Sequence, residues 1–135
     1  MAGSQPGPRA YNRADRQMAN GRPPQHRWRR YKTARGGDPV KHFVDGLTET
    51  ETVELAAAMK DVETNGLAAA RHVRGEIYEV RASGNKRALR VLFASEGKRV
   101  FLALDGFAKK TQKTPPGKIK LAESRLKDWR ARAAT

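Results

Sequence analysis

The sequence predicts an α+β fold: a small antiparallel, mixed-edge sheet of about four strands, two N-terminal helices packed on one face, and a C-terminal helix. Three observations predict it. The stretch from Glu76 to Pro116 alternates apolar, strand-like runs with turn residues. Two amphipathic helix patterns precede this stretch, and a third follows it. The length of 135 residues suits one domain of ordinary size.

Residues 1–26 differ in composition from the rest of the chain. They are rich in Gly, Pro, Arg, Gln and Asn and contain almost no large apolar side chain. Such a segment cannot bury enough surface to offset its ordering entropy, so we expect a disordered basic arm before a folded domain over residues 27–135. The arm is either an RNA contact or a dispensable tail.

The first strand and the first helix are predicted next. Residues 27–33 (RWRRYKT) alternate imperfectly between aromatic and charged side chains, which indicates a strand. Asp38 followed by Pro39 places an N-cap before a proline at the first helical position. One apolar stripe follows at i, i+3, i+4 and i+7, formed by Val40, Phe43, Val44 and Leu47.

A second helix is predicted to begin after Thr48, which forms a capping box with Glu51. Asn65-Gly66 ends it, because glycine suits the left-handed conformation beyond a helix. The outer face of this helix is acidic, so we expect the helical hairpin to lie away from any polyanion and to act as scaffold. The buried face is formed by Leu55, Met59 and Val62.

Three strands are predicted over residues 77–82, 87–94 and 99–107, after a linker over residues 67–75. Gly84-Asn85 and Glu96-Gly97 supply the two hairpin turns.

The chain is expected to leave the third strand at Asp105-Gly106 and to enter a basic loop over residues 108–114. Thr114-Pro115 then begins the last helix by the same cap-and-proline pattern. One face of this helix is apolar and holds Ile119, Ala122, Leu126 and Trp129. The other face is basic and holds Lys118, Lys120, Arg125 and Lys127.

Two arginines stand inside the otherwise apolar strands. If the first hairpin is centred between Asn85 and Lys86, Arg81 lies directly opposite Arg90. Like charges that face each other across two strands are destabilising unless something neutralises them, and a bound phosphate would do so. A shift of one residue would instead pair Arg90 with Glu79 in an ordinary cross-strand salt bridge. The sequence leaves both registers open.

The net charge of +14 is segregated along the chain. Residues 1–35 hold nine basic residues and one acidic residue (+8), residues 36–70 hold two and seven (−5), and residues 71–135 hold 17 and six (+11). Segregated positive charge attracts a polyanion, of which nucleic acid is the commonest.

Several function classes are excluded or disfavoured. The absence of cysteine excludes disulfides, thiolate catalysis and Cys-ligated zinc. The three histidines show no metal-ligand spacing, so no metal or other cofactor is expected. No apolar run approaches the roughly 18 residues of a membrane span, and no signal-peptide core is visible, so we expect a cytoplasmic protein without a membrane partner.

The order of elements and three motifs resemble the RelE/ParE toxin superfamily, in its phage-derived HigB-like branch. The motifs are YEVR (Tyr78 to Arg81), RVLF (Arg90 to Phe93) and GFAKKTQKTP (Gly106 to Pro115). The last is long and specific. The resemblance covers roughly Arg27 to Arg132 and implies a RelE-like fold for the domain over residues 27–135.

This resemblance implies a ribosome-dependent mRNA endonuclease, or mRNA interferase, the toxin of a type II toxin–antitoxin pair. Such enzymes work without a metal, through attack of the 2′-hydroxyl on the adjacent phosphate. The implied catalytic residues are Arg81, Arg90, Lys109 and Lys110, with either lysine as a candidate base. The implied RNA-binding residues are Tyr78, Arg74, Thr111, Gln112 and Lys113.

The implied partners are a cognate helix-turn-helix antitoxin, the ribosome and mRNA, with DNA reached only through the antitoxin complex. Two alternatives remain open at this point. One is a ParE-like toxin that is not a nuclease, because fold alone does not distinguish the two. The other is a basic nucleic-acid-binding module without catalysis.

Overall fold

The computed structural model describes residues 25–83, 87–110 and 113–134. Five strands form one sheet in the order β1-β5-β4-β3-β2, in which β1 runs parallel to β5 and the other neighbours are antiparallel. The strands are β1 (Arg27–Arg30), β2 (Arg71–Arg74), β3 (Ile77–Ser83), β4 (Ala88–Glu96) and β5 (Val100–Lys109). The helices are α2 (Pro39–Asp45), α3 (Glu49–Asn65), the 3-10 helix η1 (Gly66–Ala69) and α4 (Pro116–Ala133). The α+β class and the mixed edge are therefore confirmed.

The number of strands differs from the prediction, because the expected linker over residues 67–75 is structured. It contains η1 and then β2, which pairs with β3 through an irregular register between His72 and Arg74. Val73 is the one apolar residue in this strand and packs against the α4 side of the sheet. A strand of four residues with one apolar side chain carries almost no periodic signal, which explains the error.

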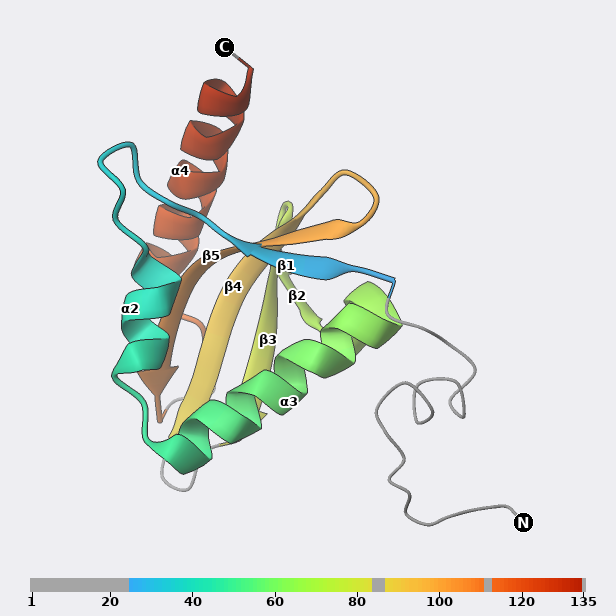
Figure 1. Ribbon diagram of the computed structural model, residues 1–135, viewed down its shortest axis with the longest axis vertical. Helices are drawn as coiled ribbons and strands as arrows, with labels where there is room; N and C mark the ends of the chain where they lie inside the picture. The colour runs from blue at the N-terminus through green and yellow to red at the C-terminus, as the bar shows by residue number, and fades with distance from the viewer. Residues whose placement is uncertain (1–24, 84–86, 111–112, 135) are drawn as a thin grey trace, which may run out of the picture.

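The helices cover both faces of the sheet (Figure 1). Helices α2 and α3 lie over one face, where Val40, Leu55 and Val62 pack on Val91 and Phe93. Helix α4 lies over the opposite face. The sheet therefore separates two apolar cores, and the acidic outer surface of α3 is kept away from everything on the α4 side.

The predicted helix starts of α2 and α3 are confirmed. The Asp38 carboxylate accepts a hydrogen bond from the Lys41 N–H, with Pro39 at the first helical position. Thr48 and Glu51 form both hydrogen bonds of a capping box, at 3.1 and 3.0 Å. The Glu51 carboxylate also pairs with Arg87 at 2.9 Å. This pair ties the beginning of α3 to the segment just before β4.

The third predicted strand does not end at Asp105-Gly106 but continues to Lys109. A β-bulge explains the difference: Leu92 pairs with Asp105 and Phe93 with Ala103, so Leu104 is an additional residue in β5. Gly106 serves close packing rather than a turn. A Cβ atom at this position would lie 2.4 Å from Cδ2 of Phe43, which seats α2 against the sheet.

Helix α4 presents its predicted apolar face, since Ile119, Ala122 and Leu126 are buried. Two residues of its predicted basic face, Lys118 and Arg125, contact the sheet. Arg125 donates to Asp105 at 3.2 Å, and the Lys118 ammonium lies 3.3 Å from the same carboxylate. The bulge in β5 turns the acidic side chain toward α4, and sequence periodicity cannot show this.

Tyr31, just after β1, fastens α4 to the edge of the sheet. Its hydroxyl donates to Asp128 at 2.6 Å. Burial, followed by this contact, raises the pKa of Tyr31. The hydrogen bond from Tyr31, followed by that from Arg132, lowers the pKa of Asp128.

Some predictions fall outside the described residues, namely the disordered arm up to residue 24 and the Gly84-Asn85 turn. The second turn is confirmed: β4 ends at Glu96 and Gly97 has a φ of +68°. Among the described residues, no helix is both long and apolar enough to cross a membrane.

The Glu51→Gln variant tests the link between α3 and the sheet. The hydrogen bond from Arg87, followed by that from the Thr48 backbone, lowers the pKa of Glu51 to about 2. Since this folded pKa lies below the unfolded value of about 4.3, the carboxylate contributes stability above that value and loses it as the pH falls toward 2. We therefore expect urea denaturation to show Glu51→Gln less stable than wild type at pH 7.

The difference between Glu51→Gln and wild type should shrink steadily between about pH 5 and pH 2. Glu49→Gln, in the same helical turn, is the matched control and should show a smaller effect at pH 7. Equal stability of Glu51→Gln and wild type at pH 7 would contradict the assignment.

Candidate functional site

The two strand arginines lie directly opposite each other. Arg81 of β3 pairs in register with Arg90 of β4, so the alternative register with Glu79 opposite Arg90 is excluded. Residues two apart in a strand share a face, so Glu79 lies on the same side as Arg81. This is the α4 side, because Ile77 and Leu92 lie on the same face as these residues and pack in the core beneath α4.

A single buried carboxylate serves both arginines. The side chains of Glu79 and Arg90 are both 0% exposed. The Arg81 Nη2 atom donates to Glu79 Oε1 at 2.9 Å, and Arg90 Nη1 lies 3.9 Å from Oε2. The Thr114 hydroxyl donates to the same Oε2 atom at 2.8 Å. The two arginines thus meet at one buried carboxylate.

Arg90 occupies the centre of this group. Its Nη1 atom donates to the carbonyl of Lys113 at 3.1 Å, and its guanidinium lies 5.8 Å from the centre of the Phe107 ring. Burial, followed by repulsion from Arg81, lowers the pKa of Arg90, and Glu79 opposes that shift. Arginine nevertheless stays protonated at neutral pH. In this conformation the guanidinium of Arg90 is buried, so its charge acts on the surface without direct contact. Direct binding of a phosphate by Arg90 would require the residues that cover it to move.

The basic loop is held at its far end by the same buried group. Lys113 contributes its carbonyl to Arg90, and Thr114 contributes its hydroxyl to Glu79. Thr114 was predicted as the N-cap of the last helix, but Pro115 holds that position and α4 begins at Pro116. The structure therefore connects the loop directly to the two strand arginines.

The exposed cations near this group come from three segments. Arg81 keeps 25% of its side chain exposed, and Lys109, Lys110 and Lys113 are exposed. Lys109 pairs in register with Ala88, which shares a face with Arg90, so its side chain begins on the α4 side. Thr111 and Gln112 lie outside the described residues.

Two predicted RNA-binding residues are not brought to the arginine pair. Tyr78 lies on the other face of the sheet, where its ring is 6.0 Å from that of Phe93 and 4.9 Å from that of His72. Arg74 is held at the end of β2 by Glu123 of α4, at 2.6 Å. The bond to Glu123 raises the pKa of Arg74.

Three residues of this site were not predicted from the sequence. Glu79 was considered only as a salt-bridge partner, although alternation places it beside Arg81. Arg71 was assigned to a linker, but it pairs in register with Glu79 and its charge contributes to the lowered pKa of Arg90. Thr114 gave no signal, because a threonine before two prolines is typical of a helix start.

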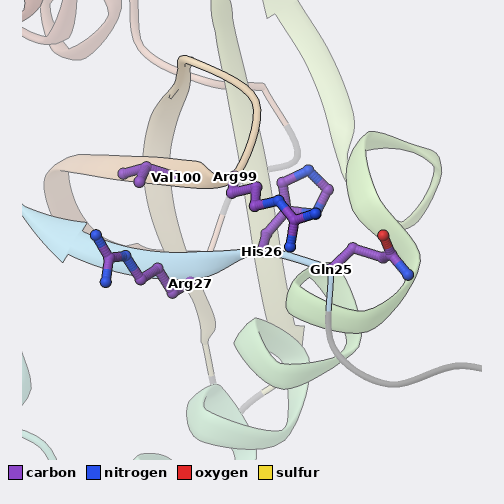
Figure 2. Close-up of a pocket in the computed structure, with 5 residues that line it drawn as sticks. All are labelled: Gln25, His26, Arg27, Arg99 and Val100. Atoms are coloured by element: carbon purple, nitrogen blue, oxygen red, sulfur yellow. The ribbon is translucent and has the colours of Figure 1, made fainter.

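A basic pocket of about 310 Å³ lies at the beginning of β5, at the end opposite to Lys109 (Figure 2). Gln25 and Arg27 extend in opposite directions from the beginning of β1, and Arg99 and Val100 complete the lining. The His26 ring stacks on Phe101 with centroids 4.2 Å apart, and its backbone N–H donates to the Glu63 carbonyl. These contacts fix the beginning of β1 against the end of α3, far along β5 from the lysine loop.

Within the described ranges, no group of three or more histidine and acidic side chains is arranged to hold a metal ion. The arginine pair itself offers fixed positive charge next to exposed ammonium groups. Such a surface can bind phosphate oxygens and stabilise negative charge that develops on them.

Residues 42–127 match the family model described as Phage derived protein Gp49-like (DUF891). This range is more than half of the chain and includes the arginine pair, the lysine loop and most of α4, so the chain belongs to this family.

Two curated relatives are similar to this chain in sequence. Both are called "Probable endoribonuclease HigB1", from Mycobacterium tuberculosis strains CDC 1551 / Oshkosh and ATCC 25618 / H37Rv. Each is 34% identical over 106 residues, which cover 76% of this chain and 84% of the relative. The predicted HigB-like membership is confirmed.

The Glu79→Gln variant tests the shared carboxylate. Loss of its charge leaves two guanidinium groups facing each other in a buried position, so we expect destabilisation of about 3 kcal/mol in urea denaturation. Glu123→Gln, which removes the half-exposed partner of Arg74, is the control and should cost less than about 1 kcal/mol. Similar losses in the two variants would show that Glu79 does not balance the arginine pair.

Proposed function

We propose that this chain is an endoribonuclease, the toxin of a type II toxin–antitoxin pair, and that it cleaves mRNA on the ribosome. The observation that supports this best is the opposed pair Arg81 and Arg90 above one shared carboxylate, beside the lysine loop. The family membership and the names of the curated relatives support the same reading.

The proposed reaction uses the RNA as its own nucleophile. The 2′-hydroxyl oxygen attacks the adjacent phosphorus, the bond from phosphorus to the 5′ oxygen breaks, and a 2′,3′-cyclic phosphate and a 5′-hydroxyl result. A base takes the 2′ proton, and an acid supplies a proton to the leaving 5′ oxygen. Negative charge builds up on the phosphate oxygens between these events, and stabilising it is the main task of the protein.

The site residues divide this task by their exposure. Arg81 reaches the surface and is the proposed direct contact for the phosphate, since its planar fork can hold two oxygens. Arg90 supplies a fixed positive charge from beneath. Lys109 or Lys110 is the proposed acid or base, because both are exposed at the end of β5.

The loop extends the contact along the RNA. We propose that Lys113, with Thr111 and Gln112, meets the phosphates or bases on either side of the cleaved bond. Tyr78 is no longer a candidate for stacking on RNA at this face, because its ring packs on the opposite side of the sheet. Arg74 would have to leave Glu123 to join the site.

The partners follow from this function. We propose that the ribosome presents mRNA to the site in the cytoplasm, and that a helix-turn-helix antitoxin neutralises the toxin and brings the pair to DNA. No cofactor has a role in this scheme, because the nucleophile belongs to the RNA and the developing charge is met by side chains.

The test is single-turnover cleavage of ribosome-bound mRNA, with 2′,3′-cyclic phosphate ends as the readout. We expect Arg81→Ala to slow cleavage by about 100-fold, because a donor to the transition-state charge is lost, and Arg81→Lys to recover part of it. Lys98→Ala removes an exposed cation from the turn before β5 and should cleave like wild type.

Each part of the proposal has an outcome that overturns it. Equal rates for Arg81→Ala and Lys98→Ala would remove the arginine pair from catalysis. Equal cleavage of free and ribosome-bound mRNA would refute ribosome dependence. Binding of RNA without cyclic phosphate ends would leave a non-catalytic module.

A further inference from the structure

The outer edge of β1 is an open end of the sheet. In the described sheet β1 is the terminal strand, and its partner β5 lies on one side only. The Arg27 N–H donates to the carbonyl of Arg99, just before β5, at 2.9 Å, and the Tyr31 N–H donates to the carbonyl of Ala103 in β5 at 2.8 Å. Backbone groups of alternate residues point to opposite edges of a strand, so those of Trp28 and Arg30 point away from β5. An edge of this kind is ready to pair with another chain.

A groove of about 450 Å³ runs along this edge. Trp28, Val44 and Met59 line it on the α2–α3 side, and Trp129 of α4 lines it on the other side. The Trp28 indole N–H donates to the Met59 carbonyl at 3.0 Å, which fixes the orientation of the ring. The groove therefore lies between the two helical layers, with one tryptophan on each side.

The rim of the groove is positively charged. Arg29, Arg30 and Lys32 line it. Arg30 pairs with Asp38 at 3.0 Å, whereas no ion pair with a carboxylate of the described chain is seen for Arg29 or Lys32. The Arg29 guanidinium lies over the Trp129 ring at 5.1 Å, a position from which it can still meet an anion. Three cations thus face one carboxylate.

The positive charge of the rim indicates which kind of segment would bind in the groove. Residues 1–26 hold four basic residues and one acidic residue, a net charge of +3, so the chain's own arm would be repelled by the rim. A second copy would bring an equally basic β1 edge. An extended segment with alternating carboxylates and apolar side chains satisfies both the unpaired backbone groups and the rim, and its apolar side chains would meet the tryptophans.

We propose that the free edge of β1 is the docking site for an acidic, extended segment of a partner protein, which adds to the sheet as a further strand. The chemistry of the groove carries this inference by itself. The identification of the partner as the antitoxin rests on the proposed function. Strands β5 and β4 lie between this edge and Arg81, so the docking surface is distinct from the arginine pair.

The test uses the full chain and a synthetic peptide of four Glu-Val repeats, with a peptide of four Lys-Val repeats as the control. The two tryptophans of the chain, Trp28 and Trp129, both line the groove, so intrinsic fluorescence reports on this surface alone. We expect a saturable fluorescence change with the acidic peptide. We also expect new protection from hydrogen exchange at the Trp28 and Arg30 amides, while the Arg27 and Tyr31 amides are already hydrogen-bonded.

A pair of charge-reversal variants provides the matched comparison. Arg29→Glu with Lys32→Glu should weaken binding of the acidic peptide at least about tenfold. Lys98→Glu with Lys120→Glu makes the same change in net charge at exposed positions outside the groove and should bind like wild type. Fluorescence at low and high salt shows the ionic part of the binding.

Three results would overturn the proposal: no saturable change below about 1 mM peptide, equal binding of the lysine peptide, or binding without protection of the Trp28 and Arg30 amides. None of these readouts depends on RNA cleavage. An inactive nuclease that binds the acidic peptide would refute the proposed function alone, and an active nuclease that fails to bind would refute the docking site alone.

Discussion

The carboxylate of Glu79 is the interaction on which the candidate site depends. Without it, two guanidinium groups would face each other across β3 and β4 with no negative charge between them. The same carboxylate accepts the Thr114 hydroxyl and so fixes the end of the lysine loop. One buried negative charge therefore holds together three segments that the chain brings from different places.

The rest of the fold places this group at a protected surface. The sheet separates it from α3, whose acidic outer face would compete for the arginines if it lay on the same side. The absence of a side chain at Gly106 allows Phe43 of α2 to pack closely on the sheet. The bulge at Leu104 orients Asp105 toward Arg125 and Lys118 of α4. These contacts fix β5 against both layers. Its C-terminal end, where Lys109 stands, thus continues from a well-packed strand.

Much of this arrangement could be predicted from local chemistry. The capping box at Thr48, the proline start at Pro39 and the apolar stripes of the helices are encoded within a few residues. The opposition of Arg81 and Arg90 followed from one of two registers. What could not be predicted depends on contacts distant in sequence. Four residues of β2 have no periodicity of their own, and Thr114 reaches Glu79 across 35 positions instead of capping α4. Tyr78 belongs to the YEVR motif, but the alternation of side chains in β3 places it in the core on the α2–α3 side of the sheet.

The parallel pairing of β1 with β5 has a consequence for biosynthesis. Arg27 meets Val100 in register, and Tyr31 binds Asp128 across 97 positions. Such long-range contacts form late, because the entropy cost of closing a large loop comes before the contacts can stabilise the fold. During translation, the sheet cannot close and Glu79 cannot receive Thr114 until nearly the whole chain has been made. The arginine pair and its shared carboxylate are therefore completed only at the end of synthesis.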